Sequence, residues 1–239
     1  MENRILLDVQ HLSAGYGRGK KRRDVIKDVS FTLRAGEILG LVGESGTGKT
    51  TLTKTLLGFL SPSAGTVAAD RTKMRAIFQN PASSLNPAFT ALSLLEEPLL
   101  AIGVKDREKR REKALQMASL CSVPEEVLRS RPGELSGGQQ QRLAIAAALV
   151  TSPELLIADE PVSALDVTVA AEILALLRKT REELGLGVLF ISHDLAVVRR
   201  LCDGVLVMEK GRIVEAGPVE RVFFSPKEAY TKKLLSAAL

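Results

Sequence analysis

The chain is poor in aromatic side chains and in cysteine. It has no tryptophan, and aromatic residues make up only 4% of its 239 residues. A core built from this sequence must therefore be mainly aliphatic. The two cysteines, Cys121 and Cys202, lack the spacing of a metal site, which favours reduced structural thiols over a disulfide framework or a zinc site.

Long apolar runs are also absent. No segment approaches the roughly 20 apolar residues that a helix needs to cross a bilayer. The amino-terminal sequence MENRILLDVQ has no signal-peptide core. We therefore expect one soluble domain.

The charge balance is basic, with a formal net charge of +5. Hydrophobic residues account for 45% and charged residues for 26%, which is ordinary for a globular protein. No aromatic residue is interleaved with the local basic run, apart from Tyr16 just before it, so a solvated loop between strands is favoured over a site for nucleic acid or an anionic membrane. The run consists of Arg18, Lys20, Lys21, Arg22 and Arg23.

Residues 43–50 have the sequence GESGTGKT and match the phosphate-binding pattern G-x-x-x-x-G-K-[ST]. A short apolar run at 37–42 precedes them, and leucines at helical spacing follow at 51–57, which predicts strand, loop and helix. Such a loop brings backbone N–H groups close to phosphate oxygens. Lys49 is placed to reach the β- and γ-phosphates of a nucleotide, and the Thr50 hydroxyl to bind Mg²⁺.

Apolar periodicity predicts an α/β fold with a mainly parallel sheet, within a single domain over residues 1–239. Residues 1–79 and 151–239 are assigned to the core, and residues 80–150 to an inserted helical subdomain. Predicted strands cover 5–9, 25–33, 37–42, 74–78, 155–158 and 187–191; helices cover 104–120, 168–184, 194–201 and the segment around Leu234; and a hairpin covers 205–214, turning at Lys210 and Gly211.

Two apolar strands end in residues that can do chemistry. The first is followed by Asp159 and Glu160, and the second leads to His193. Because parallel strands point their carboxyl ends into the ligand crevice, Asp159 is predicted near Mg²⁺ through water, and Glu160 as the general base that polarises the attacking water. Solvated acids and an exposed or helix-capping histidine are the alternatives, and His11 is given no role.

The pentapeptide LSGGQ at Leu135–Gln139 points to a family. With the preceding motifs in order, it makes the chain resemble the ATP-binding subunit of ATP-binding-cassette (ABC) transporters over nearly its whole length. The resemblance implies a P-loop NTPase core of the RecA type with helices on both faces of its sheet. It also implies ATP and Mg²⁺ as cofactors, and hydrolysis of ATP to ADP and phosphate coupled to transport.

The resemblance also implies individual roles. Tyr16 would stack on adenine, Gln79 would sense Mg²⁺, water and the membrane subunit, and His193 would hold the γ-phosphate beside Glu160. The loop that ends at Asp166 would cross a dimer interface. The implied catalytic residues are Glu160, His193 and Gln79; the Mg²⁺ residues are Thr50, Gln79 and Asp159; and the ATP-binding residues are Tyr16, Gly43, Glu44, Ser45, Gly46, Thr47, Gly48, Lys49, Thr50 and Thr51.

In this family two nucleotide-binding domains face head to tail, and each ATP lies between the phosphate loop of one and the signature of the other. Ser136, Gly137, Gly138 and Gln139 would therefore serve the ATP of a second ABC subunit, either a copy or a paralogue. Closure on ATP would drive transport. The implied partners are separate transmembrane permeases and, indirectly, an extracytoplasmic substrate-binding protein. The implied location is the cytoplasmic face of the inner membrane.

Two stretches narrow the resemblance to the oligopeptide/dipeptide/nickel importer branch. They are FQNPASSLNP at 78–87 and SPKEAYTKKLLSAAL at 225–239. The chain departs from the family pattern at two places. The stretch between Gly65 and Phe78 is short, which implies only a small antiparallel β-subdomain, and Asn80 stands where an aspartate is common. Substrates of this branch include peptides, nickel and metal chelates, and this subunit does not select among them.

Two other functions stay open at this stage. An ABC-type ATPase acting on nucleic acid or the ribosome would suit the basic pI of about 9.3. Such relatives usually carry a coiled-coil insertion or tandem cassettes, which this chain lacks, so no nucleic-acid partner is expected. A non-catalytic regulatory cassette would lack the glutamate or the histidine, and Glu160 and His193 argue against it.

Overall fold

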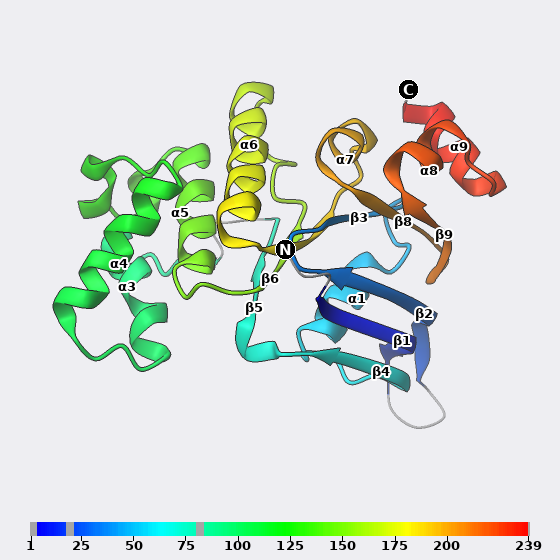
Figure 1. Ribbon diagram of the computed structural model, residues 1–239, viewed down its shortest axis with the longest axis horizontal. Coiled ribbons are helices and arrows are strands. Elements are labelled where there is room, and N and C mark those ends of the chain that lie inside the picture. Colours follow the sequence, from blue (N-terminus) through cyan, green and yellow to red (C-terminus); the bar gives the residue numbers. More distant parts are fainter. Residues whose placement is uncertain (1–3, 18–21, 80–83, 239) are drawn as a thin grey trace.

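The computed structural model of the protein describes residues 4–17, 22–79 and 84–238, and contains two sheets (Figure 1). The smaller sheet is antiparallel, with the order β2-β1-β4. Its strands are β1 (Ile5–Tyr16), β2 (Arg23–Arg34) and β4 (Ala64–Ala69). The larger sheet has the order β5-β6-β7-β3-β8-β9. Its strands are β3 (Ile38–Val42), β5 (Met74–Ile77), β6 (Leu155–Asp159), β7 (Gly187–Ile191), β8 (Gly204–Glu209) and β9 (Arg212–Pro218).

The larger sheet is parallel except for its last hairpin. Strands β5, β6, β7, β3 and β8 pair in parallel, and β8 pairs with β9 in the antiparallel sense. The carboxyl ends of β3, β6 and β7 therefore meet at one edge, as the sequence predicted. The helices are α1 (Lys49–Leu56), α3 (Ala91–Ala101), α4 (Arg107–Leu120), α5 (Gly137–Leu149), α6 (Val167–Leu184), α7 (Leu195–Leu201), α8 (Val219–Phe224) and α9 (Ala229–Ala238).

Alternating residues of the parallel strands supply two hydrophobic cores. On β3, Leu39 and Leu41 face the core that includes Leu52 and Leu56 of α1 and the inner side of the antiparallel sheet. Ile38 and Val42 face the opposite core, which the helices α5, α6 and α7 cover. Because both faces are buried, the strands are apolar throughout. Figure 1 shows α6 and α7 on one side of the larger sheet and α1 on the other, so the predicted fold class is confirmed.

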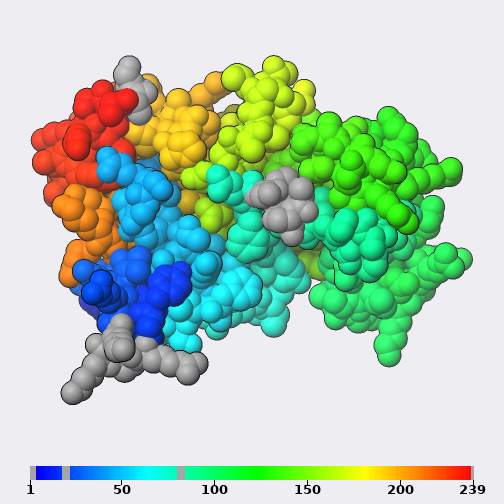
Figure 2. Space-filling view, turned by 180° about the vertical axis from the view of Figure 1, so that it is seen from behind, coloured from blue at the N-terminus to red at the C-terminus, as the bar shows by residue number. Residues whose placement is uncertain are grey.

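Helices α3, α4 and α5 form a helical lobe beside the β5 edge of the larger sheet. Figure 2 shows this lobe at one end of the molecule and the carboxy-terminal helices at the other. Helix α4 begins at the N-cap Asp106, and its second half buries Ala114, Met117 and Ala118. The first half, REKRREK, is mostly exposed. The proposed subdomain boundaries at residues 80 and 150 stay a prediction.

The antiparallel sheet is larger than the sequence predicted. Strand β1 continues to Tyr16, seven residues beyond Val9, because bulges around His11 (φ 50°) shift its register and break the period-2 pattern. Strand β4 was not predicted at all. Its sequence, AGTVAA, is weak in β-propensity, and it forms by pairing with β1, with Val67 opposite Val9.

Other sequence predictions have simple outcomes. Both cysteines are buried and unpaired, and burial raises the pKa of the Cys121 thiol to about 12. Within the described ranges no helix is long and apolar enough to span a membrane. Of the basic run, residues 18–21 lie outside the described residues, whereas Arg22 pairs with Asp24 and donates a hydrogen bond to the Ser61 carbonyl at 2.9 Å. Asn80 also lies outside them.

Candidate functional site

The phosphate-binding pattern forms the loop between β3 and α1. Gly43 has φ +155°, and a Cβ there would lie 2.3 Å from the Met208 carbonyl oxygen of β8. Gly48, at φ +113°, is in a region that side-chain-bearing residues rarely adopt. The two glycines therefore let the loop bend tightly against β8 while leaving Lys49 at the first position of α1.

Helix α1 starts without a side-chain cap. By contrast, α5, α6 and α7 are capped by Ser136, Asp166 and Asp194. The first N–H groups of a helix need an acceptor, and the helix dipole makes an anion the favoured one. The missing cap at Gly48 thus leaves the start of α1 suited to phosphate oxygens.

Lys49 lies along the loop that precedes it. Its Nζ donates hydrogen bonds to the Gly43 carbonyl at 2.7 Å and to the Glu44 carbonyl at 3.0 Å. Burial lowers the pKa of Lys49, against the opposing attraction of Glu160 and Asp159. Both acceptors are neutral, so an anion that enters the cleft can compete for the ammonium group.

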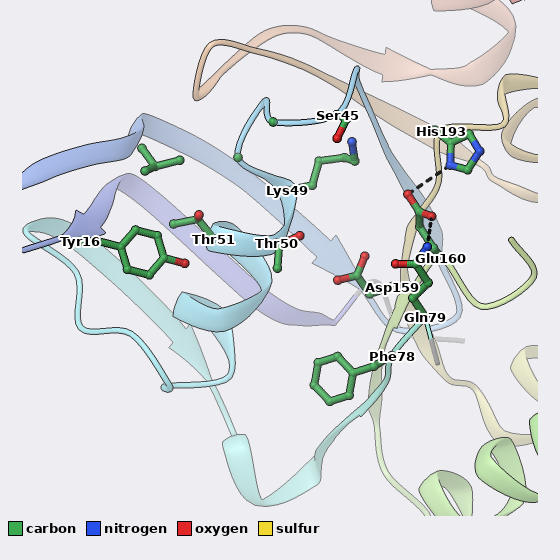
Figure 3. A pocket seen from close by; sticks show the side chains of 13 residues that line it. Tyr16, Ser45, Lys49, Thr50, Thr51, Phe78, Gln79, Asp159, Glu160 and His193 are labelled. Atoms are coloured by element: carbon green, nitrogen blue, oxygen red, sulfur yellow. Dashed lines mark hydrogen bonds and ion pairs between the residues drawn. The ribbon is translucent and has the colours of Figure 1, made fainter. Parts of the chain in front are cut away.

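Glu160 joins the ends of three neighbouring strands (Figure 3). Its Oε2 accepts a hydrogen bond from Gln79 Nε2 at 3.1 Å, and its Oε1 lies 3.1 Å from Nδ1 of His193. Gln79 follows β5, Glu160 follows β6 and His193 follows β7. The structure thus brings together three side chains that the sequence assigned separately to catalysis.

Asp159 lies at the end of β6, next to Glu160 and across from Lys49. Burial raises the pKa of Asp159, and the charge of Glu160 raises it further, against the opposing effect of Lys49. Two adjacent carboxyl groups in a partly buried site favour a cation between them and the ligand. This is the electrostatic setting of a metal-dependent phosphate site.

These groups line one cleft of about 860 Å³. In Figure 3, Tyr16 lies at one end of it and Glu160 with His193 at the other, with Lys49, Thr50 and Thr51 between them. A nucleotide has this same order of a flat base and a phosphate tail. The cleft is lined by Tyr16, Val25, Ser45, Gly46, Gly48, Lys49, Thr50, Thr51, Phe78, Gln79, Asp159, Glu160 and His193.

Val25 and Phe78 are lining residues that the sequence did not point out as such. Val25 lies on β2, which pairs with the end of β1 that carries Tyr16, and Phe78 directly precedes Gln79. Both fall at the ends of the predicted strands 25–33 and 74–78, and neither was given a role in the cleft. Proximity to Tyr16 and Gln79 was the one available signal.

The donors in the cleft fit Mg²⁺. The Thr50 hydroxyl, the Gln79 amide and the Asp159 carboxylate all line it. Among the residues described, no cluster of three or more His, Cys, Asp or Glu side chains could hold a metal by itself. Mg²⁺ suits such a sparse set, since it keeps several waters and uses phosphate oxygens as ligands.

The signature residues lie elsewhere. Ser136 is the N-cap of α5 and forms a capping box with Gln139: Gln139 N donates to Ser136 Oγ at 3.3 Å, and Ser136 N donates to Gln139 Oε1 at 2.9 Å. None of residues 136–139 is among those lining the cleft. Asp166 caps α6 by accepting from Val169 N, and the next residue, Val167, is 87% exposed.

Comparison with known proteins agrees with this geometry. A family model described as ABC transporter matches residues 26–163. The chain belongs to the ABC transporter family. A putative peptide import ATP-binding protein of Brucella ovis is 40% identical over 247 residues, covering 97% of this chain and 78% of the relative. The oligopeptide transport ATP-binding protein OppF of Streptococcus pyogenes serotype M1 is 41% identical, covering 97% and 81%.

Solved ABC structures share the fold. A dimeric ATP-binding cassette in a post-hydrolysis state bound to ADP and Pi superposes with a TM-score of 0.79 at 30% identity, covering 90% of this chain and 99% of that one. The cbiO1 protein of Clostridium perfringens, part of the cbiONQ transporter complex, gives 0.84 at 28%, covering 94% and 92%. This ABC protein is thus an ATP-binding, ATP-hydrolysing subunit. Nothing in these matches favours a nucleic-acid or ribosome ATPase.

Proposed function

We propose that this ABC ATPase powers the import of peptides. The proposal is supported by the relatives at 40% and 41% identity, which are named for peptide import and oligopeptide transport. The observation that carries the hydrolytic part is the single cleft in which Lys49, Asp159, Glu160 and His193 meet. Nickel and metal chelates are the alternative cargoes that the sequence resemblance leaves open.

ATP would bind along the cleft from Tyr16 to Glu160. Tyr16 is 48% exposed, so its ring can stack on adenine, with Val25 beside it. The phosphates would follow the loop from Ser45 to Thr51, where the uncapped start of α1 and the Lys49 ammonium favour negative charge. Thr50, Gln79 and, through water, Asp159 would hold Mg²⁺, which would neutralise part of the phosphate charge.

Glu160 would accept the proton of the attacking water. The water oxygen bonds to the γ-phosphorus, the bond to the bridging oxygen of ADP breaks, and the proton passes to Glu160. Gln79 and His193 bond to the two oxygens of Glu160 and so fix its orientation. The His193 side chain is 63% exposed, which allows it to contact the γ-phosphate.

A second ABC subunit would complete each site. Residues 136–139 do not line this chain's own cleft, and the Ser136–Gln139 capping box leaves the N–H groups of Gly137 and Gly138 without those side-chain acceptors. In the head-to-tail arrangement of the family, these groups would contact the γ-phosphate of the partner's ATP, and Asp166 would lie at the interface. The dimer would bind separate permeases at the cytoplasmic face of the inner membrane. An extracytoplasmic binding protein would deliver the substrate to these permeases.

Glu160→Gln tests the hydrolytic assignment. The amide cannot accept the water proton, so we expect kcat to fall about 10²- to 10⁴-fold while ATP binding is kept. Turnover is measured by phosphate release, and dimerisation with ATP and Mg²⁺ by light scattering. Glu183→Gln, on the exposed face of α6, is the matched control. Wild-type turnover in the Glu160 variant would remove this residue as the base.

Cargo is tested on the complete transporter. We expect the reconstituted complex with its permeases and binding protein to show ATPase stimulation by short peptides. Stimulation by nickel or a metal chelate, with none by peptides, would replace peptide import with the alternative cargo. Either result leaves the hydrolytic assignment intact, because that rests on Glu160.

A further inference from the structure

The carboxy-terminal helix contacts the phosphate-binding loop. The hydroxyl of Tyr230, on α9, accepts a hydrogen bond from the backbone N–H of Glu44 at 3.1 Å, across 186 residues of sequence. Tyr230 belongs to the segment 225–239, which resembles the importer branch but has no part in the hydrolytic chemistry described above. The contact therefore suggests a role for this segment in nucleotide binding.

The bonded N–H belongs to the peptide unit that also holds Lys49. This unit joins the Gly43 carbonyl to the Glu44 nitrogen. Its oxygen accepts from Lys49 Nζ at 2.7 Å, while its N–H donates to Tyr230 at 3.1 Å. Because a peptide unit is planar, the direction of one group fixes that of the other. Tyr230 thus sets the orientation of the carbonyl on which the Lys49 ammonium lies.

The loop beyond this peptide unit faces solvent. Gly43 is buried, whereas Glu44, Ser45 and Gly46 are exposed. The Glu44 carbonyl accepts hydrogen bonds from within the loop and the start of α1: from Thr47 Oγ1 at 2.9 Å, from Lys49 Nζ at 3.0 Å and from Thr47 N at 3.4 Å. Tyr230 therefore supplies a restraint on the peptide at 43–44 that comes from outside the loop.

Tyr230 is itself held in place by β9. Glu215, only 7% exposed, accepts hydrogen bonds from the N–H groups of Lys227 at 3.0 Å and Glu228 at 3.1 Å, just before α9 begins. Burial opposes the ionisation of Glu215, but these bonds hold its pKa below the usual value. Further along α9, Leu235 is buried in the core that α5, α6 and α7 also cover. Helix α9 is thus fixed at both its start and its apolar face.

The Tyr230 hydroxyl stays uncharged near neutral pH. Burial raises its pKa, the charges of Glu44 and Glu209 raise it further, and the bond from Glu44 N opposes them. A neutral hydroxyl can accept from the loop without repelling phosphate.

We propose that Tyr230 is a positioning residue of the ATP site, which orients the 43–44 peptide and through it Lys49. The inference rests on the proposed nucleotide site at residues 43–51. It assigns to the carboxy-terminal segment a direct influence on ATP affinity, separate from the residues that touch the nucleotide.

Tyr230→Phe removes the hydroxyl and keeps the ring. We expect the Kd of the full chain for ATP with Mg²⁺, measured by calorimetry, to rise about three- to tenfold, as for the loss of one hydrogen bond. In the transporter complex the KM for ATP should rise by the same factor with kcat nearly unchanged. Ser236→Ala, which removes an exposed hydroxyl from the same helix, is the control and should leave both values unchanged.

Two comparisons decide the outcome. Lys49→Ala should weaken ATP binding more than tenfold, since it removes the charge that faces the phosphates. If Lys49→Ala has that effect and Tyr230→Phe binds ATP as wild type does, the positioning role is wrong and the nucleotide site stands. If Lys49→Ala leaves ATP affinity unchanged, the proposed site itself is wrong. A fall in kcat without a rise in KM would also overturn the role of Tyr230.

Discussion

Glu160 combines an unusual backbone conformation with hydrogen bonds from both its backbone and its side chain. Its φ of +50° lies in the left-handed region, which costs a residue with a side chain about 1 kcal/mol or more. Its N–H donates to the Ile191 carbonyl at 2.9 Å, and its carboxylate bonds to Gln79 and His193. The neighbouring strand β7 therefore holds the strained backbone in the position that directs the carboxylate at both partners.

Asp159→Asn separates the stability of the site from its function. Burial and the charge of Glu160 raise the pKa of Asp159, so its ionised form destabilises the folded protein. Without nucleotide at pH 7, we expect Asp159→Asn to raise Tm. With ATP and Mg²⁺ the wild type should have the higher Tm, because it gains more stability from the bound ligands than the variant does. Differential scanning calorimetry under both conditions measures the two shifts.

The difference in stability between the wild type and Asp159→Asn without nucleotide should depend on pH in one direction. Because the folded pKa of Asp159 is raised, the folded state binds more protons, and the stability of the wild type without nucleotide falls as pH rises from the unfolded pKa, about 3.9, through the folded value. The advantage of the asparagine variant should therefore disappear when the pH is lowered toward 4. A variant that is less stable than wild type at pH 7 without nucleotide would contradict this interpretation of the site.

The β8–β9 hairpin supports the phosphate loop from behind. At its turn, the Gly211 N–H donates to the Thr47 carbonyl at 2.9 Å, and the Gly211 carbonyl accepts from Lys27 N at 2.8 Å. A Cβ at Gly211 would lie 1.9 Å from the Val25 carbonyl oxygen, and its φ is +83°. One glycine thus joins the hairpin, β2 and the loop.

Gly211→Ala should disrupt this junction. The added methyl clashes with backbone, so we expect a loss of about 2 kcal/mol or more in the free energy of unfolding and weaker ATP binding. Gly36→Ala is the control. It has a similar φ of +71° but no atom within 4 Å of the added Cβ, so it should cost only about 1 kcal/mol. Equal losses in urea denaturation would contradict the packing argument.

At the scale of the whole molecule, the cleft and the signature are separate. The cleft lies at the carboxyl edge of the larger sheet, whereas residues 136–139 begin α5 in the helical lobe. In the proposed dimer, each copy of the chain would therefore present two half-sites that do not serve each other. Two subunits facing head to tail would use both.

Ser136→Arg tests this separation. The arginine adds bulk and removes the cap of α5. We expect the Glu160→Gln variant, which keeps its ATP unhydrolysed, to dimerise with ATP and Mg²⁺. The double variant with Ser136→Arg should lose this dimerisation, while each subunit still binds ATP. Light scattering with and without ATP and Mg²⁺ measures dimerisation. Ser119→Arg, exposed on α4, adds the same charge within the helical lobe and should leave the dimer intact. Dimerisation of the Ser136 variant would argue against the proposed use of the signature.

Local sequence predicted much of this protein because its strongest signals are short-range. The glycine pattern at 43–50, the carboxylates after β6 and the buried runs of β3, β6 and β7 each depend on neighbouring residues. Prediction from local sequence failed where pairing between distant segments decided the structure. Strand β4, made mostly of small residues, is a strand only because β1 lies beside it.

The sequence by itself determined the fold class, the family and the residue types of the candidate site, because motif spacing and strand periodicity are local properties. Only the tertiary structure decided which atoms meet. It joined Gln79 and His193 to opposite oxygens of Glu160, and Tyr230 to the peptide that holds Lys49. These contacts span up to 186 residues, and they depend on strand order and helix docking, which local sequence does not encode.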